Sequence, residues 1–103
     1  MKRLYHLKTK ANDIDLCYSQ DIHKLLVIKF DHDYCIVHLP ELDPEDIVMV
    51  CHNQGLQNGY ECNYNLYPFF YVGDCYLIDK EFKGLSDEQI THIDTWLQSL
   101  QHN

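Results

Sequence analysis

The sequence predicts an α+β fold, in which a mainly antiparallel sheet is covered by helices. Three observations support this class. The last part of the chain has the apolar spacing of an amphipathic helix, several short β-rich runs precede it, and turn residues separate those runs. The chain has 103 residues, of which 46% are hydrophobic and 23% charged, and this composition fits one globular domain over 1–103.

The helix signal is strongest over about 86–101. Ser86 is a favourable N-cap, and Gln89 three residues later completes a capping box. Leu85 and Ile90 stand where a hydrophobic staple would join them. The apolar residues that follow repeat at helical spacing and predict a face that packs on the sheet: Ile90, Ile93, Leu97 and Leu100, flanked by Trp96.

Two β-rich runs in the first half of the chain predict a hairpin. They are Leu25–Phe30 and Tyr34–Leu39, and Asp31-His32-Asp33 separates them as a short polar loop. Aspartate is common in turns because its carboxylate bonds nearby backbone amides. Arg3–Lys8 and Ile14–Tyr18 are further strand candidates with weaker patterns.

The second half contains two more strand signals. Apolar and polar residues alternate through Tyr60–Tyr67, which is typical of a half-buried strand with Tyr64 inward and Asn63 outward. Phe69–Val72 and Cys75–Ile78 flank Gly73-Asp74, and a glycine-first loop of two residues predicts a type II′ hairpin.

A second helix is expected over about 44–53. Asp43 would be its N-cap, Pro44 its first residue, and Glu45 and Asp46 would favour its dipole. The β-branched pair Ile47-Val48 keeps a strand open as the alternative. Both helices are expected on one face of the sheet.

Charge is distributed unevenly along the chain. The formal net charge is −8, and no lysine or arginine occurs between Lys29 and Lys80. That stretch also carries most of the aromatic residues. Direct binding of nucleic acid or of an anionic membrane needs a basic surface, so both are disfavoured. An acidic surface of this kind attracts basic partners instead.

The five cysteines are expected to be reduced and mostly buried. Cys17, Cys35, Cys51, Cys62 and Cys75 include no CxxC pair. The first ten residues have no apolar segment behind their charges, so no secretory signal is recognised. No apolar run approaches the ~20 residues that span a bilayer. A cytoplasmic location is the expectation.

Two His/Cys groups have spacings that deserve comparison with known sites. His32, Cys35 and His38 are residue types that zinc prefers, but strand alternation would place Cys35 opposite the two histidines. Cys51 and His52, with Cys62, could pair a nucleophile and a base, although adjacent side chains point apart. Both groups are more simply structural.

Motifs for other chemistry are missing from the sequence. Gly55 and Gly59 lack the Lys-Ser/Thr of a phosphate-binding loop, and there is no GxSxG, HExxH or calcium-loop pattern. Arg3 is the single arginine. These absences favour a binding protein over an enzyme, with no catalytic residue, no metal and no cofactor.

The leading hypothesis is a stoichiometric inhibitor or immunity-type protein. It would mimic nucleic acid and block the basic site of an effector such as a nuclease, since inhibitors of nucleases, including those that phages direct at host nucleases, are often small, acidic and α+β. The partner-binding residues would be the carboxylates of the acidic stretch: Asp31, Asp33, Glu41, Asp43, Glu45, Asp46, Glu61 and Asp74.

Two alternatives belong to other classes. One is a small metal- or thiol-dependent enzyme or sensor that uses the His/Cys set. The other is a self-associating structural adaptor, in which the aromatic segment from Pro68 to Tyr71 forms a homodimer interface.

Overall fold

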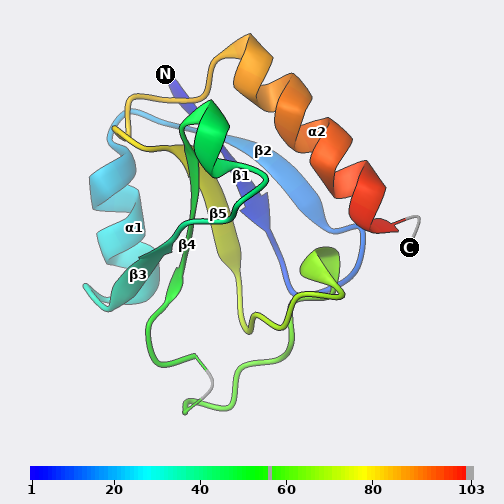
Figure 1. Ribbon diagram of the computed structural model, residues 1–103. Helices are drawn as coiled ribbons and strands as arrows, with labels where there is room; N and C mark the ends of the chain where they lie inside the picture. Colours follow the sequence, from blue (N-terminus) through cyan, green and yellow to red (C-terminus); the bar gives the residue numbers. More distant parts are fainter. Residues whose placement is uncertain (56, 102–103) are drawn as a thin grey trace.

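Five strands and two α-helices form an α+β fold in the computed structural model, which describes residues 1–55 and 57–101 (Figure 1). The predicted fold class is therefore confirmed. In chain order the elements are β1 (Lys2–Leu7), β2 (Ile14–Ser19), α1 (Ile22–Phe30), β3 (Tyr34–Val37), η1 (Asp43–Glu45), β4 (Ile47–His52), η2 (Tyr64–Leu66), β5 (Cys75–Asp79) and α2 (Asp87–Gln101), where η marks a short 3₁₀ turn.

The sheet has the strand order β2-β1-β5-β4-β3, and every neighbouring pair is antiparallel. β5 comes last in the chain yet inserts between β1 and β4. Leu77 lies opposite Tyr5 of β1 and Met49 of β4. The centre of the sheet therefore joins segments that are far apart in the sequence.

The two central strands are buried on both faces. Successive side chains of a strand point to opposite faces, and here Met49 and Leu77 pack under α2 while Val50 and Ile78 pack under α1. α1 and α2 thus cover opposite faces of the sheet (Figure 1). The expectation that both helices share one face is wrong, because a strand that is apolar on both faces needs cover on both.

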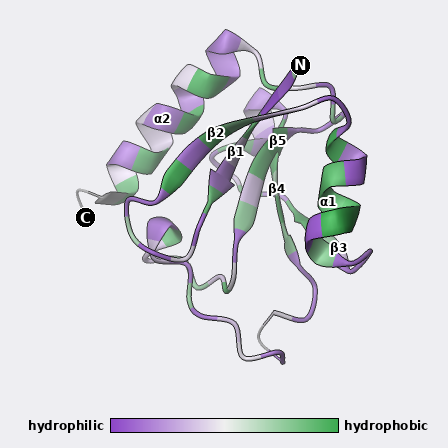
Figure 2. Ribbon diagram, turned by 180° about the vertical axis from the view of Figure 1, so that it is seen from behind, coloured by the Kyte–Doolittle hydropathy of each residue, from purple (hydrophilic) through white to green (hydrophobic). Residues whose placement is uncertain are grey.

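α1 replaces the first strand of the predicted hairpin. Asp21 caps it by accepting from the Lys24 amide at 3.1 Å. Ile22, Leu26 and Phe30 are its buried residues, and their spacing of four is helical. The helix is mostly hydrophobic, and its β-branched residues suit a strand, but packing of this stripe against the sheet overrides that propensity (Figure 2).

The predicted loop of Asp31-His32-Asp33 is a turn, but it ends a helix and does not connect two strands. Asp31 and His32 adopt the left-handed region with φ of 51° and 65°. The Asp33 amide then donates to Phe30 O at 2.9 Å. The chain enters β3, which confirms the second strand of the predicted hairpin over Tyr34–Val37.

The helix expected over 44–53 is a strand instead, as the alternative allowed. Pro44 lies in η1, and β4 begins at Ile47. The first five residues of β4 are all buried. Burial on both faces removes the alternation that would have marked a strand, and so the start signals at Asp43 and Pro44 were misleading.

Tyr60–Tyr67 is not the predicted half-buried strand. Asn63 and Asn65 are buried, whereas the tyrosine between them is 58% exposed. The buried amides are satisfied by backbone groups: Asn63 Nδ2 donates to Leu7 O and Gly73 O, both at 2.9 Å. Of the predicted hairpin that follows, β5 is confirmed, while the preceding run contributes only an isolated bridge between Cys62 and Val72.

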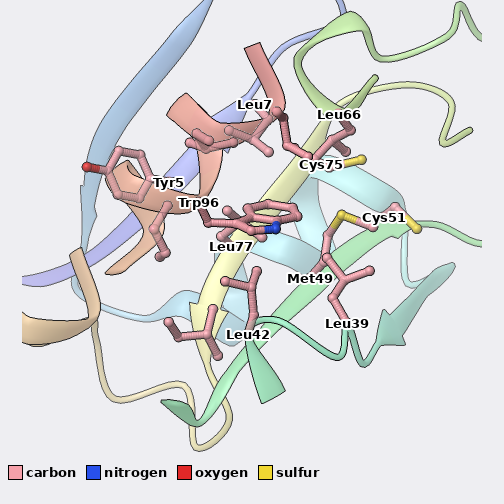
Figure 3. Close-up of a cluster of buried hydrophobic side chains, with 14 of the residues drawn as sticks. Tyr5, Leu7, Leu39, Leu42, Met49, Cys51, Leu66, Cys75, Leu77 and Trp96 are labelled. Carbon is pink, nitrogen blue, oxygen red and sulfur yellow. The ribbon is translucent and has the colours of Figure 1, made fainter. Parts of the chain in front are cut away.

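α2 agrees with its prediction over Asp87–Gln101. The Gln89 amide donates to Ser86 Oγ at 3.1 Å, and the Ser86 amide donates to Gln89 Oε1 at 2.9 Å, which completes the capping box. Trp96 packs in the larger core cluster, where Cys51 and Cys75 lie on one side (Figure 3). Neither described helix combines the length and apolar character needed to cross a membrane.

Replacing Ser86 tests the capping box. Ser86→Ala removes the acceptor for the Gln89 amide, and the free energy of unfolding in urea should fall by about 1 kcal/mol. Thr95→Ala is the matched control, because Thr95 Oγ1 bonds Thr91 O within the same helix and caps nothing. An equal loss in both variants would contradict the capping role.

Asn65 provides a second test, because its side chain bonds several backbone groups of the β1–β2 connection. It donates to Lys8 O at 2.7 Å and Lys10 O at 2.9 Å and accepts from the Asn12 amide at 2.7 Å. Asn65→Ala should lower the free energy of unfolding by at least about 2 kcal/mol, since partly buried groups lose their partners. The exposed Asn53, changed to Ala, should cost less than about 0.5 kcal/mol; similar costs would argue against the bracing role of Asn65.

Candidate functional site

The eight predicted partner-binding carboxylates separate into two groups at opposite ends of β4. Asp33 lies beside the end of β4, since the Asn53 amide donates to its carbonyl at 3.0 Å. Asp46 immediately precedes the start of β4. The first group contains Asp31, Asp33, Glu61 and Asp74, and the second contains Glu41, Asp43, Glu45 and Asp46. The six residues of β4 place the groups about 20 Å apart.

The second group occupies the turn between β3 and β4. Leu39 and Leu42 are buried in the core and anchor this turn to it. The Asp43 amide donates to Leu39 O at 2.8 Å, which keeps the turn tight. Because leucines occupy the inner side, the carboxylates of Glu41 and Glu45 remain exposed.

α2 binds the same turn and adds its own carboxylates. Gln89 Nε2 donates to Glu45 O at 3.0 Å, and His92 Nε2 lies 3.0 Å from Glu41 O. The turn and the start of α2 therefore lie at one end of the molecule (Figure 1). We call the six carboxylates gathered there the acidic face: Glu41, Asp43, Glu45, Asp46, Asp87 and Glu88.

The start of α2 is positioned by a buried carboxylate. Asp79 ends β5, is 8% exposed, and accepts from the amides of Lys83 at 2.9 Å and Gly84 at 2.8 Å. Gly84 has a φ of 107°, and a Cβ there would lie 3.1 Å from the Lys2 backbone. This turn leads directly to Leu85, whose amide donates to Arg3 O at 2.9 Å. Asp87 follows two residues later.

Two cations contact the acidic face. Lys80 Nζ lies 2.9 Å from Asp43 Oδ1 and 3.7 Å from Asp46 Oδ1, and Arg3 Nη1 lies 2.7 Å from Asp87 Oδ1. Six carboxylates and these two cations leave a formal charge of −4. Within the described residues, no ion pair involves Glu41, Glu45 or Glu88. Hydrogen bonds from Lys80 and from His38 hold the pKa of Asp43 below its usual value.

The first group lies in mixed surroundings. Glu61 and Asp74 line a cleft of about 450 Å³ together with Lys29, His52 and Tyr60. Asp74 Oδ2 also lies 2.8 Å from His6 Nε2. Basic and aromatic groups therefore lie among these carboxylates at this end of the sheet.

The predicted His/Cys groups do not assemble. His32 lies in the turn after α1, Cys35 lies in β3, and His38 Nδ1 lies 3.0 Å from Asp43 Oδ1. Cys51 packs on the α2 side, while His52 contacts Phe30 edge-on at a centroid distance of 6.0 Å. In 1–55 and 57–101, no three His, Cys, Asp or Glu side chains are arranged to hold a metal ion.

A different cysteine group is present. Cys35, Cys51 and Cys75 lie opposite one another on β3, β4 and β5, with Cys35 Sγ and Cys51 Sγ 3.5 Å apart. We call these three residues the thiol row. Hydrogen bonds from Cys75 and Cys35 lower the pKa of Cys51 against the effect of burial. The pKa of Cys75 is raised by its bond to Cys51 and by burial.

Sequence reasoning missed two features of these sites. It left Asp87 and Glu88 out of the predicted partner-binding residues, although the absence of lysine and arginine after Lys83 was a signal of a wider acidic surface. It grouped Cys51 with Cys62, because only the strand register brings Cys51 beside Cys35 and Cys75. Comparison of the chain with protein-family models, curated proteins and solved structures found no match.

The titration of Asp43 tests the electrostatics of the acidic face. NMR should give Asp43 a pKa below the ordinary ~3.9. Because folding lowers this pKa, the ion pair stabilises the folded state at pH values above the ordinary pKa of aspartate. This stabilisation is lost as the pH falls through the pKa of Asp43 in the folded protein. Lys80→Gln should raise the pKa of Asp43 toward the ordinary value.

Lys83→Gln is the control, since Lys83 Nζ pairs with Glu81 at 2.9 Å and should leave Asp43 unchanged. An Asp43 pKa that does not respond to Lys80→Gln would show that this ion pair does not hold in solution.

Proposed function

We propose that the protein is a cytosolic binding factor that inhibits a basic nucleic-acid-binding effector, such as a nuclease. In this proposal the acidic face covers the basic groove of the effector and occupies the positions of nucleic-acid phosphates. The observation that carries the proposal is the attachment of the 41–46 turn to α2, which gathers carboxylates from two distant segments into one face.

The charge of this face favours a basic partner. Opposite potentials speed diffusional encounter, and the attraction between exposed charges weakens with salt. Like charge repels nucleic acid itself, so the same surface disfavours direct binding of DNA or RNA. Glu41, Glu45 and Glu88 are exposed and therefore available to guanidinium and ammonium groups.

α2 extends the surface beyond the turn. Its 15 residues span about 22 Å, and its exposed residues include Asp87, Glu88 and Asp94, of which Asp94 also accepts from the Tyr5 hydroxyl. The helix contains no lysine or arginine. A rigid helix of this kind can present negative charge along a groove at little cost in conformational entropy.

The test compares two variants of equal charge change. Glu41→Gln/Glu45→Gln/Asp46→Asn alters the acidic face, and Asp31→Asn/Asp33→Asn/Glu61→Gln alters the opposite end of the sheet. Each tagged protein is used for affinity capture from lysate of its native host at low and high salt, followed by mass spectrometry. The wild type should recover a basic nucleic-acid-binding protein at low salt and lose it at high salt.

The variant of the acidic face should weaken the affinity for that partner at least about tenfold, because three charge contacts are removed, and the other variant should retain it. Added wild-type protein should then displace nucleic acid from the purified partner. The proposal fails if the acidic-face variant binds as the wild type does, or if partner and nucleic acid bind together.

A further inference from the structure

The thiol row has the geometry of a pair that can be oxidised. Cys35 and Cys51 are directly opposite residues of antiparallel strands, with their sulfur atoms 3.5 Å apart. Such residues have Cα atoms about 4.5–5.5 Å apart, and disulfides bridge Cα separations of about 4.4–6.8 Å. Forming the bond requires the sulfur atoms to approach by about 1.5 Å.

The position of β3 allows that approach. β3 is an edge strand and pairs only with β4 in the described sheet. Cys75 lies in β5, which is held between β1 and β4, and its thiol is fully buried and directed at Gly73 O. Cys35 can therefore move toward Cys51 more easily than Cys75 can.

A small cavity gives access to the pair. It has a volume of about 260 Å³, and the residues that line it include Cys35, Cys51, Phe70, Tyr71 and Val72. A water molecule occupies about 30 Å³, so a small peroxide fits. Cys75 is fully buried, whereas Cys51 is 8% exposed and Cys35 is partly exposed. Cys35 and Cys51 are therefore the accessible members of the row.

Hydrogen bonding within the row favours a thiolate at its centre. Cys51 Sγ lies 3.5 Å from Cys35 Sγ, and the neighbouring thiols lower the pKa of Cys51 against the effect of burial. Burial and the neighbouring Cys51 raise the pKa of Cys35, which stays protonated. The thiolate is the nucleophilic form of cysteine.

We propose that Cys51 and Cys35 form a peroxide-oxidised dithiol site, a function independent of partner binding by the acidic face. Cys51 Sγ attacks one peroxide oxygen, an S–O bond forms, the O–O bond breaks, and the displaced hydroxide takes a proton from solvent. Cys35 Sγ then attacks Cys51 Sγ; the S–O bond breaks, and the leaving hydroxyl departs as water with the proton of Cys35. Two thiols and one hydrogen peroxide give one disulfide and two waters.

The remaining thiol has a separate part in this site. Cys75 lies opposite Cys51 on β5, but its buried thiol is directed at Gly73 O, so it does not enter the bond. The disulfide would join the edge strand β3 to β4 and border the cavity, so a reductant can reach it. A dithiol reductant therefore restores the pair.

The experiment treats the wild-type protein with hydrogen peroxide below one equivalent and maps alkylated cysteines by mass spectrometry. The expected product has lost two hydrogens, carries one disulfide between Cys35 and Cys51, and reverts with dithiothreitol. Both thiols should disappear together and at least about tenfold faster than Cys17 and Cys62, which lie outside the row.

Variants separate the roles of the two sulfur atoms. Cys35→Ser should accumulate a sulfenic acid on Cys51 that a 1,3-dicarbonyl probe captures, whereas Cys51→Ser should show no fast oxidation. Cys17→Ser is the matched control and should behave as the wild type. If a variant of the thiol row does not fold, the disulfide map of the wild-type protein is the test. The proposal is overturned if oxidation occurs first at Cys17 or Cys62, if a Cys51–Cys75 bond forms, or if no disulfide forms.

Discussion

The burial of β4 and β5 on both faces is the constraint on which the rest of the structure depends. Each strand carries an unbroken apolar run, Ile47–Cys51 in β4 and Cys75–Ile78 in β5. A sheet built around such strands exposes apolar area on both sides unless helices cover both. α1 and α2 provide this cover, and the connections that deliver them then carry the polar residues to the two ends of the sheet.

This arrangement accounts for where the carboxylates collect. Burial of a charged side chain is unfavourable unless it is hydrogen-bonded. Asp79 is buried at the end of β5, where two backbone amides donate to its carboxylate. The same amides shape the turn that starts α2. Asp79 therefore connects the end of the central strand β5 to the turn that positions the start of α2, and with it Asp87 and Glu88 of the acidic face.

Local signals predicted some of these elements and long-range contacts decided the others. The capping box of Ser86 and Gln89 depends on neighbours in the sequence, and α2 was predicted with its boundaries. α1 was mistaken for a strand because the β propensity of Val27 and Ile28 opposes a helix that only packing stabilises. β4 was mistaken for a helix because two-sided burial leaves no alternation.

The candidate sites show the same division. The carboxylates of the 41–46 turn are adjacent in the sequence, and so they could be predicted as a cluster. Asp87 joins them through contacts across more than 40 positions, as the Gln89 bond to Glu45 shows, and sequence pattern does not report such contacts. The thiol row is defined by strand register, which is a property of the assembled sheet. Asn63 and Asn65 were expected to face solvent because their backbone partners are likewise distant.

The charge of α2 is the strongest reason to look for a role outside folding. A helix gains stability from cations near its C-terminus, yet the last turn of α2 has none, and from Ser86 onward the chain has no lysine or arginine. Lys80 and Arg3 contact three of the six carboxylates of the acidic face, although interspersed cations would lower the repulsion among the remainder. Stability of the folded state alone favours a surface there on which cations lie among the carboxylates. The proposed binding to a basic partner would favour the surface that is present, because such a partner would supply the missing cations.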